Sequence, residues 1–149
     1  MKAAKYGILI MGWLFASVSF AQEPGPRAGL GIGYVDIDAI NVGTSGIAGV
    51  NVGYGFNRIV GLDIEYGRLF SGISGNLYSA FATFTTTGNV YMKGKIGGTT
   101  SSGGSLDGGS GSLGIGIGGK VADHWVLELD LVGYSSDIYG GVLFFKYVK

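Results

Sequence analysis

The chain has 149 residues, 31 of them glycine and none cysteine, and only 13% of its residues are charged, with a formal net charge of zero. This length suits a single domain. The lack of cysteine excludes disulfides and leaves no recognisable transition-metal site beside a single histidine, and the balanced charge offers no basic surface to a nucleic acid.

The first 21 residues have the pattern of a secretory signal peptide. Lys2 and Lys5 give a basic start, residues 7–20 form an apolar run, and residues 19–21 place small side chains where a signal peptidase reads them. A retained membrane anchor is the alternative, but the run is shorter than the ~20 residues that a helix needs to cross hydrocarbon. We expect export, with residues 22–149 as the mature domain.

In the mature chain, apolar residues alternate with small or charged ones, which is the period of a β-strand with two unlike faces. The clearest segment is residues 125–134, where Leu127 and Leu129 alternate with Glu128 and Asp130. A helix would scatter the acids among the leucines. The alternation predicts eight strands, at about residues 27–35, 47–56, 59–70, 77–85, 90–99, 110–120, 125–134 and 138–148.

The joins between these strands differ in character. Residues 36–45, 71–76 and 100–109 are longer and rich in glycine, serine or both, as loops are. The brief joins are residues 57–58, 86–89, 121–124 and 135–137. No join is long enough to hide a crossover helix, so we expect each strand to pair with the next in an antiparallel, up-and-down order.

Two all-β structures fit this pattern: a soluble barrel with its apolar face inside, and a transmembrane barrel with that face against lipid. Aromatic residues near the strand ends distinguish them, because two aromatic girdles flanking an aliphatic band suit a bilayer. The girdle residues at the brief-turn end are Tyr54, Phe56, Phe84, Trp125, Phe145 and Tyr147; those at the long-loop end are Tyr34, Tyr66, Phe70, Tyr78 and Tyr139.

Rows of glycine also favour the transmembrane barrel over the soluble one. Gly114, Gly116 and Gly118 share one face of a strand. Such a face fits a narrow interior, whereas toward water it would cost chain entropy without any gain in solubility. The sequence therefore predicts an all-β, eight-stranded antiparallel up-and-down transmembrane β-barrel.

In that barrel the charged side chains of three strands point into the lumen. They are Asp63, Glu65, Lys93, Lys95, Glu128 and Asp130. Unpaired charges in a confined interior are costly, so we expect them to pair across it. Because the carboxylates outnumber the lysines, Lys120, Lys146 or Arg27 must offset the surplus, or a carboxylate must stay protonated. The paired charges make either a plug or a gated polar pore.

The mature chain resembles the small outer-membrane β-barrel family of Gram-negative bacteria, the eight-stranded domains related to opacity proteins and the OmpA-like transmembrane region, often labelled porin family. Residues 78–84, a short turn and residues 89–97 look like the fourth and fifth strands of that family. Phe145 and Tyr147 fit its final strand, although the chain continues to Lys149, where the family usually ends on Phe or Trp. The resemblance implies a location in the outer membrane.

Three motifs suggest enzymes but fail on inspection. Residues 114–120 match the first positions of a phosphate-binding loop, yet Val121 stands where Ser or Thr should bind magnesium. The same glycines fit a dinucleotide fingerprint without a following helix. His124, the only histidine, has Val126 two residues on, where lipid-modifying barrel hydrolases carry a serine.

We therefore expect a non-enzymatic outer-membrane barrel without cofactors, with a structural or surface-interaction role. Its expected partners are the lipid bilayer, lipopolysaccharide and the outer-membrane assembly machinery. A narrow pore for ions or very small solutes is the alternative, and an outer-leaflet lipid-modifying enzyme is a weaker one.

Overall fold

The computed structural model describes residues 24–38, 43–103 and 108–149. The expected signal peptide, residues 1–21, lies outside these described residues. Within them no helix is long and apolar enough to cross a membrane. The strands are β1 (Gly25–Ile37), β2 (Gly43–Gly55), β3 (Val60–Phe70), β4 (Gly75–Thr85), β5 (Val90–Ser102), β6 (Gly108–Ala122), β7 (Trp125–Ser135) and β8 (Ile138–Val148).

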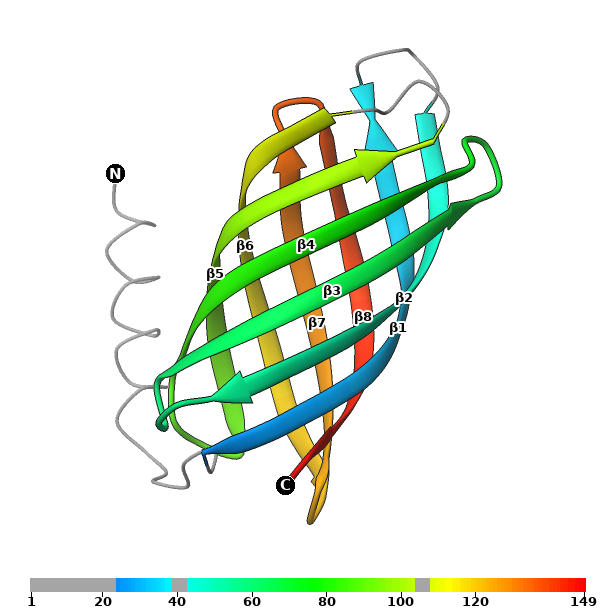
Figure 1. The fold of residues 1–149 in the computed structure, drawn as a ribbon. Helices are drawn as coiled ribbons and strands as arrows, with labels where there is room; N and C mark the ends of the chain where they lie inside the picture. Colours follow the sequence, from blue (N-terminus) through cyan, green and yellow to red (C-terminus); the bar gives the residue numbers. More distant parts are fainter. Residues whose placement is uncertain (1–23, 39–42, 104–107) are drawn as a thin grey trace, which may run out of the picture.

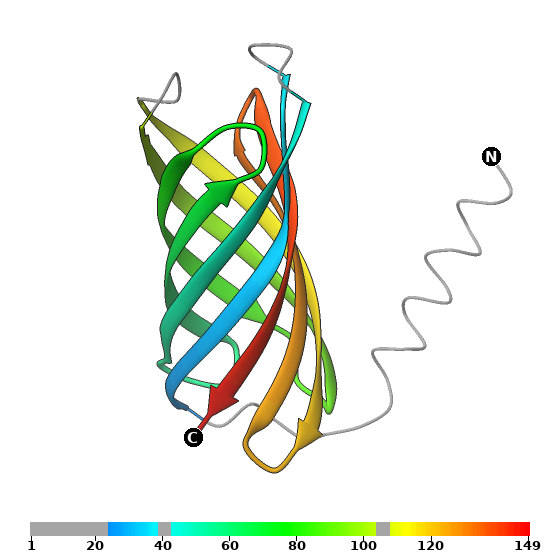
Figure 2. The same cartoon turned by 90° about the vertical axis from the view of Figure 1, so that its right-hand side faces the viewer.

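Every strand pairs antiparallel with its neighbours in sequence, and β1 also pairs with β8, which closes the sheet into a barrel (Figure 1). The closing register runs from Arg27 opposite Val148 to Ile37 opposite Ile138. The strands tilt steeply against the barrel axis, as closure of a sheet requires (Figure 2). The predicted fold class, an eight-stranded antiparallel up-and-down β-barrel, is confirmed.

The two ends of the barrel differ (Figure 2). One end, here called the loop end, carries the connections β1–β2, β3–β4, β5–β6 and β7–β8. The other, the turn end, carries the remaining three connections and the end of β8. In the β2–β3 turn, Asn57 Oδ1 accepts hydrogen bonds from the backbone N–H groups of Ile59 and Val60, both at 2.8 Å, which fixes this hairpin.

The strands extend further toward the loop end than expected. β1 continues to Ile37, β2 already begins at Gly43, and β5 and β6 reach Ser102 and Gly108. The predicted loops at residues 36–45 and 100–109 were therefore too long. The strand β1 is longer because its alternation continues: Val35 and Ile37 extend the row of inward-facing residues.

The apolar face of the sheet lies on the outside. In β7 the leucines Leu127 and Leu129 are each 42% exposed, whereas Glu128 and Asp130 are 1% and 0% exposed. A soluble barrel would have the reverse arrangement. An outer surface of Leu, Ile and Val this extensive suits contact with an apolar medium, as in a transmembrane barrel.

Candidate functional site

The lumen brings the charged residues of three strands together. Asp63 and Glu65 on β3, Lys93 and Lys95 on β5, and Glu128 and Asp130 on β7 all point inward and are buried. The alternation of each strand places them there, because each charged pair occupies two successive inward positions.

The two lysines of β5 connect the acids of β3 and β7. Lys93 Nζ lies 3.3 Å from Asp63 Oδ2, 3.3 Å from Asp130 Oδ2, and also contacts Glu128. Lys95 Nζ lies 2.8 Å from Asp130 Oδ2 and contacts Glu65. Each lysine thus bridges the interior between strands that are not neighbours in the sheet.

Two further cations complete the charge balance. Lys146 Nζ on β8 lies 2.5 Å from Glu128 Oε1 and 3.7 Å from Asp63 Oδ2, and an Arg27 guanidinium nitrogen lies 3.4 Å from Asp63 Oδ1. Four cationic side chains therefore meet four carboxylates inside the barrel, and we call these eight residues the ion-pair network.

Lys120 does not join this network, although it was considered as a counter-charge. Its side chain is exposed at the turn end of β6. The register between β6 and β7 shifts between Lys120 and Ala122, at the rim of the barrel, where a lysine head group can reach water.

Neutral side chains also contact the network. The Tyr91 hydroxyl donates to Glu128 Oε2 at 2.6 Å, and Asn51 Nδ2 donates to Glu65 Oε1 at 3.0 Å. Lys95 Nζ also lies 4.5 Å from the centre of the Phe81 ring. Sequence reasoning did not include Tyr91, Asn51 or Phe81, although their inward positions in the alternation were the available signal.

The glycine rows make room for these long side chains. On β6, Gly116 lies opposite Lys93 and Asp130, and Gly118 lies opposite Tyr91 and Glu128. A methyl group at Gly116 would collide with Asp130 Oδ1, and one at Gly118 would collide with the Tyr91 ring. The predicted glycine-lined interior is thus a set of sockets that each receive a side chain from a neighbouring strand.

Toward the loop end the lumen is filled by apolar side chains instead of charges. These residues form one buried cluster, here called the apolar cluster: Val35, Ile37, Ile47, Leu69, Leu77, Phe81, Val132, Tyr134, Ile138, Val142 and Phe144. The predicted strands already contained all of these residues except Ile37, which fell in the predicted loop 36–45; what alternation did not reveal is that they meet as one cluster inside the barrel.

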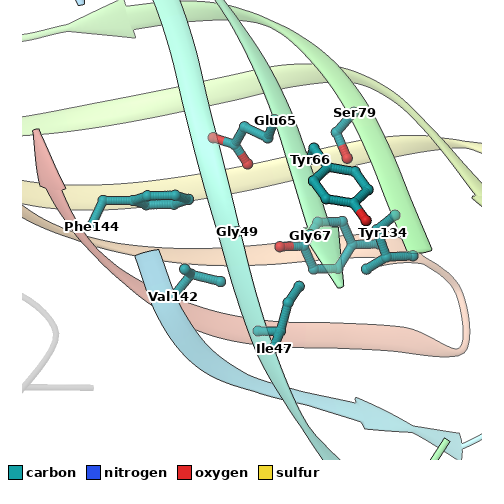
Figure 3. Close-up of a pocket in the computed structure, with 10 residues that line it drawn as sticks. Ile47, Gly49, Glu65, Tyr66, Gly67, Ser79, Tyr134, Val142 and Phe144 are labelled. Carbon is teal, nitrogen blue, oxygen red and sulfur yellow. The ribbon is translucent and has the colours of Figure 1, made fainter. Parts of the chain in front are cut away.

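A small cavity lies between the ion-pair network and the apolar cluster (Figure 3). It is bordered by Glu65, Ser79 and Tyr134 and by apolar residues that include Ile47 and Phe144. Its size suits about one water molecule, so it offers no room for an organic ligand.

The residues predicted as aromatic girdles lie on the outer face near the strand ends. All are exposed apart from Tyr66, which is half-buried and donates a hydrogen bond from its hydroxyl to Asn76 Oδ1 at 2.8 Å. At the turn end, Trp125 stacks on Phe145 with 4.6 Å between ring centres. Aromatic rings at both ends of the barrel are the arrangement that membrane interfaces favour.

The remaining motifs acquire plain structural roles. Residues 114–120 are part of strand β6 and form no phosphate-binding loop. His124 is exposed at the turn end, where its Nδ1 lies 3.2 Å from the carbonyl oxygen of Val148. Among residues 24–38, 43–103 and 108–149, no group of three His, Cys, Asp or Glu side chains is arranged to hold a metal ion.

No protein-family model matches this sequence, and no curated protein matches it closely enough to be informative. Solved structures do match. A de novo designed transmembrane β-barrel superimposes with a TM-score of 0.63 at 16% identity, covering 86% of this chain and 98% of the design.

Two natural barrels superimpose as well. The N-terminal β-barrel domain of Pseudomonas aeruginosa OprF gives a TM-score of 0.57 at 15% identity, covering 84% of this chain and 98% of that domain. Ail, the attachment invasion locus protein of Yersinia pestis, was solved in complex with the heparin analogue sucrose octasulfate. It gives a TM-score of 0.55 at 16% identity, and the match covers 83% of this chain and 96% of Ail. The chain thus has the fold of the small eight-stranded outer-membrane barrels, and the predicted resemblance is confirmed at the level of fold.

Proposed function

We propose that the mature chain is an exported, non-enzymatic outer-membrane barrel with a structural or surface-interaction role and a lumen plugged by its own side chains. The observation that supports this proposal is the burial, inside the barrel, of the charge-balanced ion-pair network and of the apolar cluster. Buried charges of equal number and opposite sign favour a fixed arrangement, since removing either sign leaves the other uncompensated.

The outer face supports the location. Its exposed Leu, Ile and Val side chains match a bilayer core, and its aromatic residues at both ends match the two interfaces. The bilayer and, at the loop end, lipopolysaccharide are therefore its proposed surroundings, and insertion would depend on the outer-membrane assembly machinery. The likeness to Ail and OprF agrees with this location, and the attachment role in the name of Ail agrees with a surface interaction.

Location and folding are tested first. After membrane fractionation, the protein should be found with the outer membrane and should migrate differently on a gel before and after boiling. An epitope inserted at Gly72, in the β3–β4 connection, should be labelled on intact cells, whereas one inserted at Gly88, in the β4–β5 connection, should need permeabilised cells. Labelling of Gly88 alone on intact cells would reverse the orientation.

Conductance separates the plug from a narrow pore. Purified protein in a planar bilayer should give no regular current steps, because the ion-pair network and the apolar cluster occupy the lumen. The cavity between them has room for only about one water molecule. Reproducible steps from the wild-type barrel would contradict the plug and favour a pore for ions or very small solutes.

A further inference from the structure

On strands β3 and β7 the inward-facing residues change from charged to small or apolar toward the loop end. On β3 the inward residues after Asp63 and Glu65 are Gly67 and Leu69, and on β7 Glu128 and Asp130 are followed by Val132 and Tyr134. The charges therefore lie toward the turn end and the apolar side chains toward the loop end. The two groups occupy successive levels of the lumen.

Six strands contribute to the apolar level: β1, β2, β3, β4, β7 and β8. Val35, Ile37, Leu69 and Leu77 are at most 2% exposed, so solvent at the loop end does not reach them. Ile73, from the β3–β4 connection, packs against the cluster. A water-filled mouth would not bury aliphatic side chains in this way.

Strands β5 and β6 complete the circumference with hydroxyl groups that bond to one another. Ser79 of β4 and Thr99 of β5 are joined at 2.7 Å, and Ser112 of β6 donates to Thr99 Oγ1 at 2.8 Å. These buried hydroxyls have protein partners and so provide no open polar path along this wall.

We propose that the apolar cluster is a water-excluding seal that closes the loop end of the lumen independently of the ion-pair network. An ion entering this level would lose its hydration shell and find no compensating charge, which is costly. Hydrophobic constrictions in channels close by excluding water in the same way. The inference rests on the proposed closed lumen and adds that there are two barriers in series. Ions pass only when both are broken.

Conductance of four proteins tests the series arrangement: wild type, a network variant (Lys93→Met with Lys95→Met), a seal variant (Leu69→Ser with Leu77→Ser) and their combination. We expect current steps from the combination alone. If the network variant conducts as well as the combination, the apolar cluster is no barrier and the inference is wrong. If the wild type itself conducts, the proposed closed lumen fails instead.

The rate of chemical labelling of introduced cysteines tests the seal independently of conductance. The chain has no cysteine, so single cysteines can be placed on β4 at Ser79, next to the apolar cluster, and at Thr83, beside Arg27 of the network. Both positions are buried, at 5% and 0% exposure. A charged, water-soluble thiol reagent should label the Ser79→Cys thiol at least about tenfold faster in the seal variant than in the otherwise wild-type barrel, with the rate at Thr83→Cys unchanged.

Folding is checked for every variant by the shift on gels before and after boiling. If the double serine variant does not fold, Ile47→Ser on β2 breaches the same level from another strand. Equal, slow labelling at Ser79→Cys in a folded seal variant and in the otherwise wild-type barrel would overturn the seal.

Discussion

Lys146 and Glu128 lie on neighbouring strands, with 2.5 Å between the lysine Nζ and the carboxylate Oε1. Glu128 also contacts Lys93 and accepts from Tyr91, so one carboxylate joins β5, β7 and β8. Lys146 extends the connection to Asp63 on β3. The last strand of the chain is thereby tied to strands that do not pair with it in the sheet.

The first prediction follows from this position of Lys146. Replacing it by Met should destabilise the barrel by about 3–5 kcal/mol, because Glu128 and Asp63 lose a buried counter-charge. The measurement is urea unfolding of the barrel in lipid vesicles. Lys120→Met is the matched control, since that lysine is exposed at the turn end and should tolerate the change. Equal losses at both positions would argue against the network.

The second prediction concerns the outer face. Leu129→Arg places a charge midway along β7 on the exposed side and should cost about 2–4 kcal/mol in a bilayer. Val121→Arg, at the turn end of β6, should cost only about 0–1 kcal/mol because the charge reaches the interface there. Both are measured by urea unfolding in lipid vesicles. The same loss at both sites would contradict a bilayer around the barrel.

Most of the barrel's strand arrangement can be predicted from the alternation of apolar and polar residues alone. A period of two in β7 separates its leucines from Glu128 and Asp130, and the same rule orders the other strands. The choice of the outward apolar face came from the aromatic residues at the strand ends, such as Trp125 and Tyr139. These inferences need only the local sequence, which explains why they agree with the barrel.

Contacts across the lumen are not local and were harder to predict. Alternation places Lys146, Arg27 and Lys120 on one face, but the tilt and stagger of the strands decide which of them meet the acids. Lys146 and Arg27 do, whereas Lys120 lies beyond the rim. The apolar cluster was missed for the same reason: all of its residues except Ile37 lie on predicted strands, but their meeting at one level depends on the same tilt and stagger.

The third prediction compares two changes within the network. Lys93→Met with Lys95→Met leaves four carboxylates facing only Arg27 and Lys146, and should destabilise the barrel by at least about 3–5 kcal/mol. Glu65→Gln should cost only about 1–3 kcal/mol, since Lys95 keeps Asp130 as a partner. Unfolding midpoints in urea provide the comparison. An unchanged midpoint in the double variant would mean that these charges are solvated.

The last prediction concerns the glycine sockets, with two glycines of β6 as a matched pair. A methyl group at Gly116 would collide with Asp130 Oδ1, whereas one at Gly111 meets nothing within 4 Å. Gly116→Ala should therefore cost about 1–3 kcal/mol through overpacking. Gly111→Ala should be neutral or stabilise by about 0.4–1 kcal/mol, because it restricts the unfolded chain.

A double-mutant cycle identifies the cause of any loss at Gly116. If the methyl group acts by displacing the Asp130 carboxylate from Lys95, then Gly116→Ala should cost less in an Asp130→Ala background, where that carboxylate is missing. The expected coupling between the two sites is about 0.5–3 kcal/mol. Additive losses would mean that the methyl group disturbs only the backbone of β7, whose Leu129 carbonyl oxygen lies 3.2 Å from the added carbon. In that case the glycine row would serve the spacing of the strands and not the seating of the ion pairs.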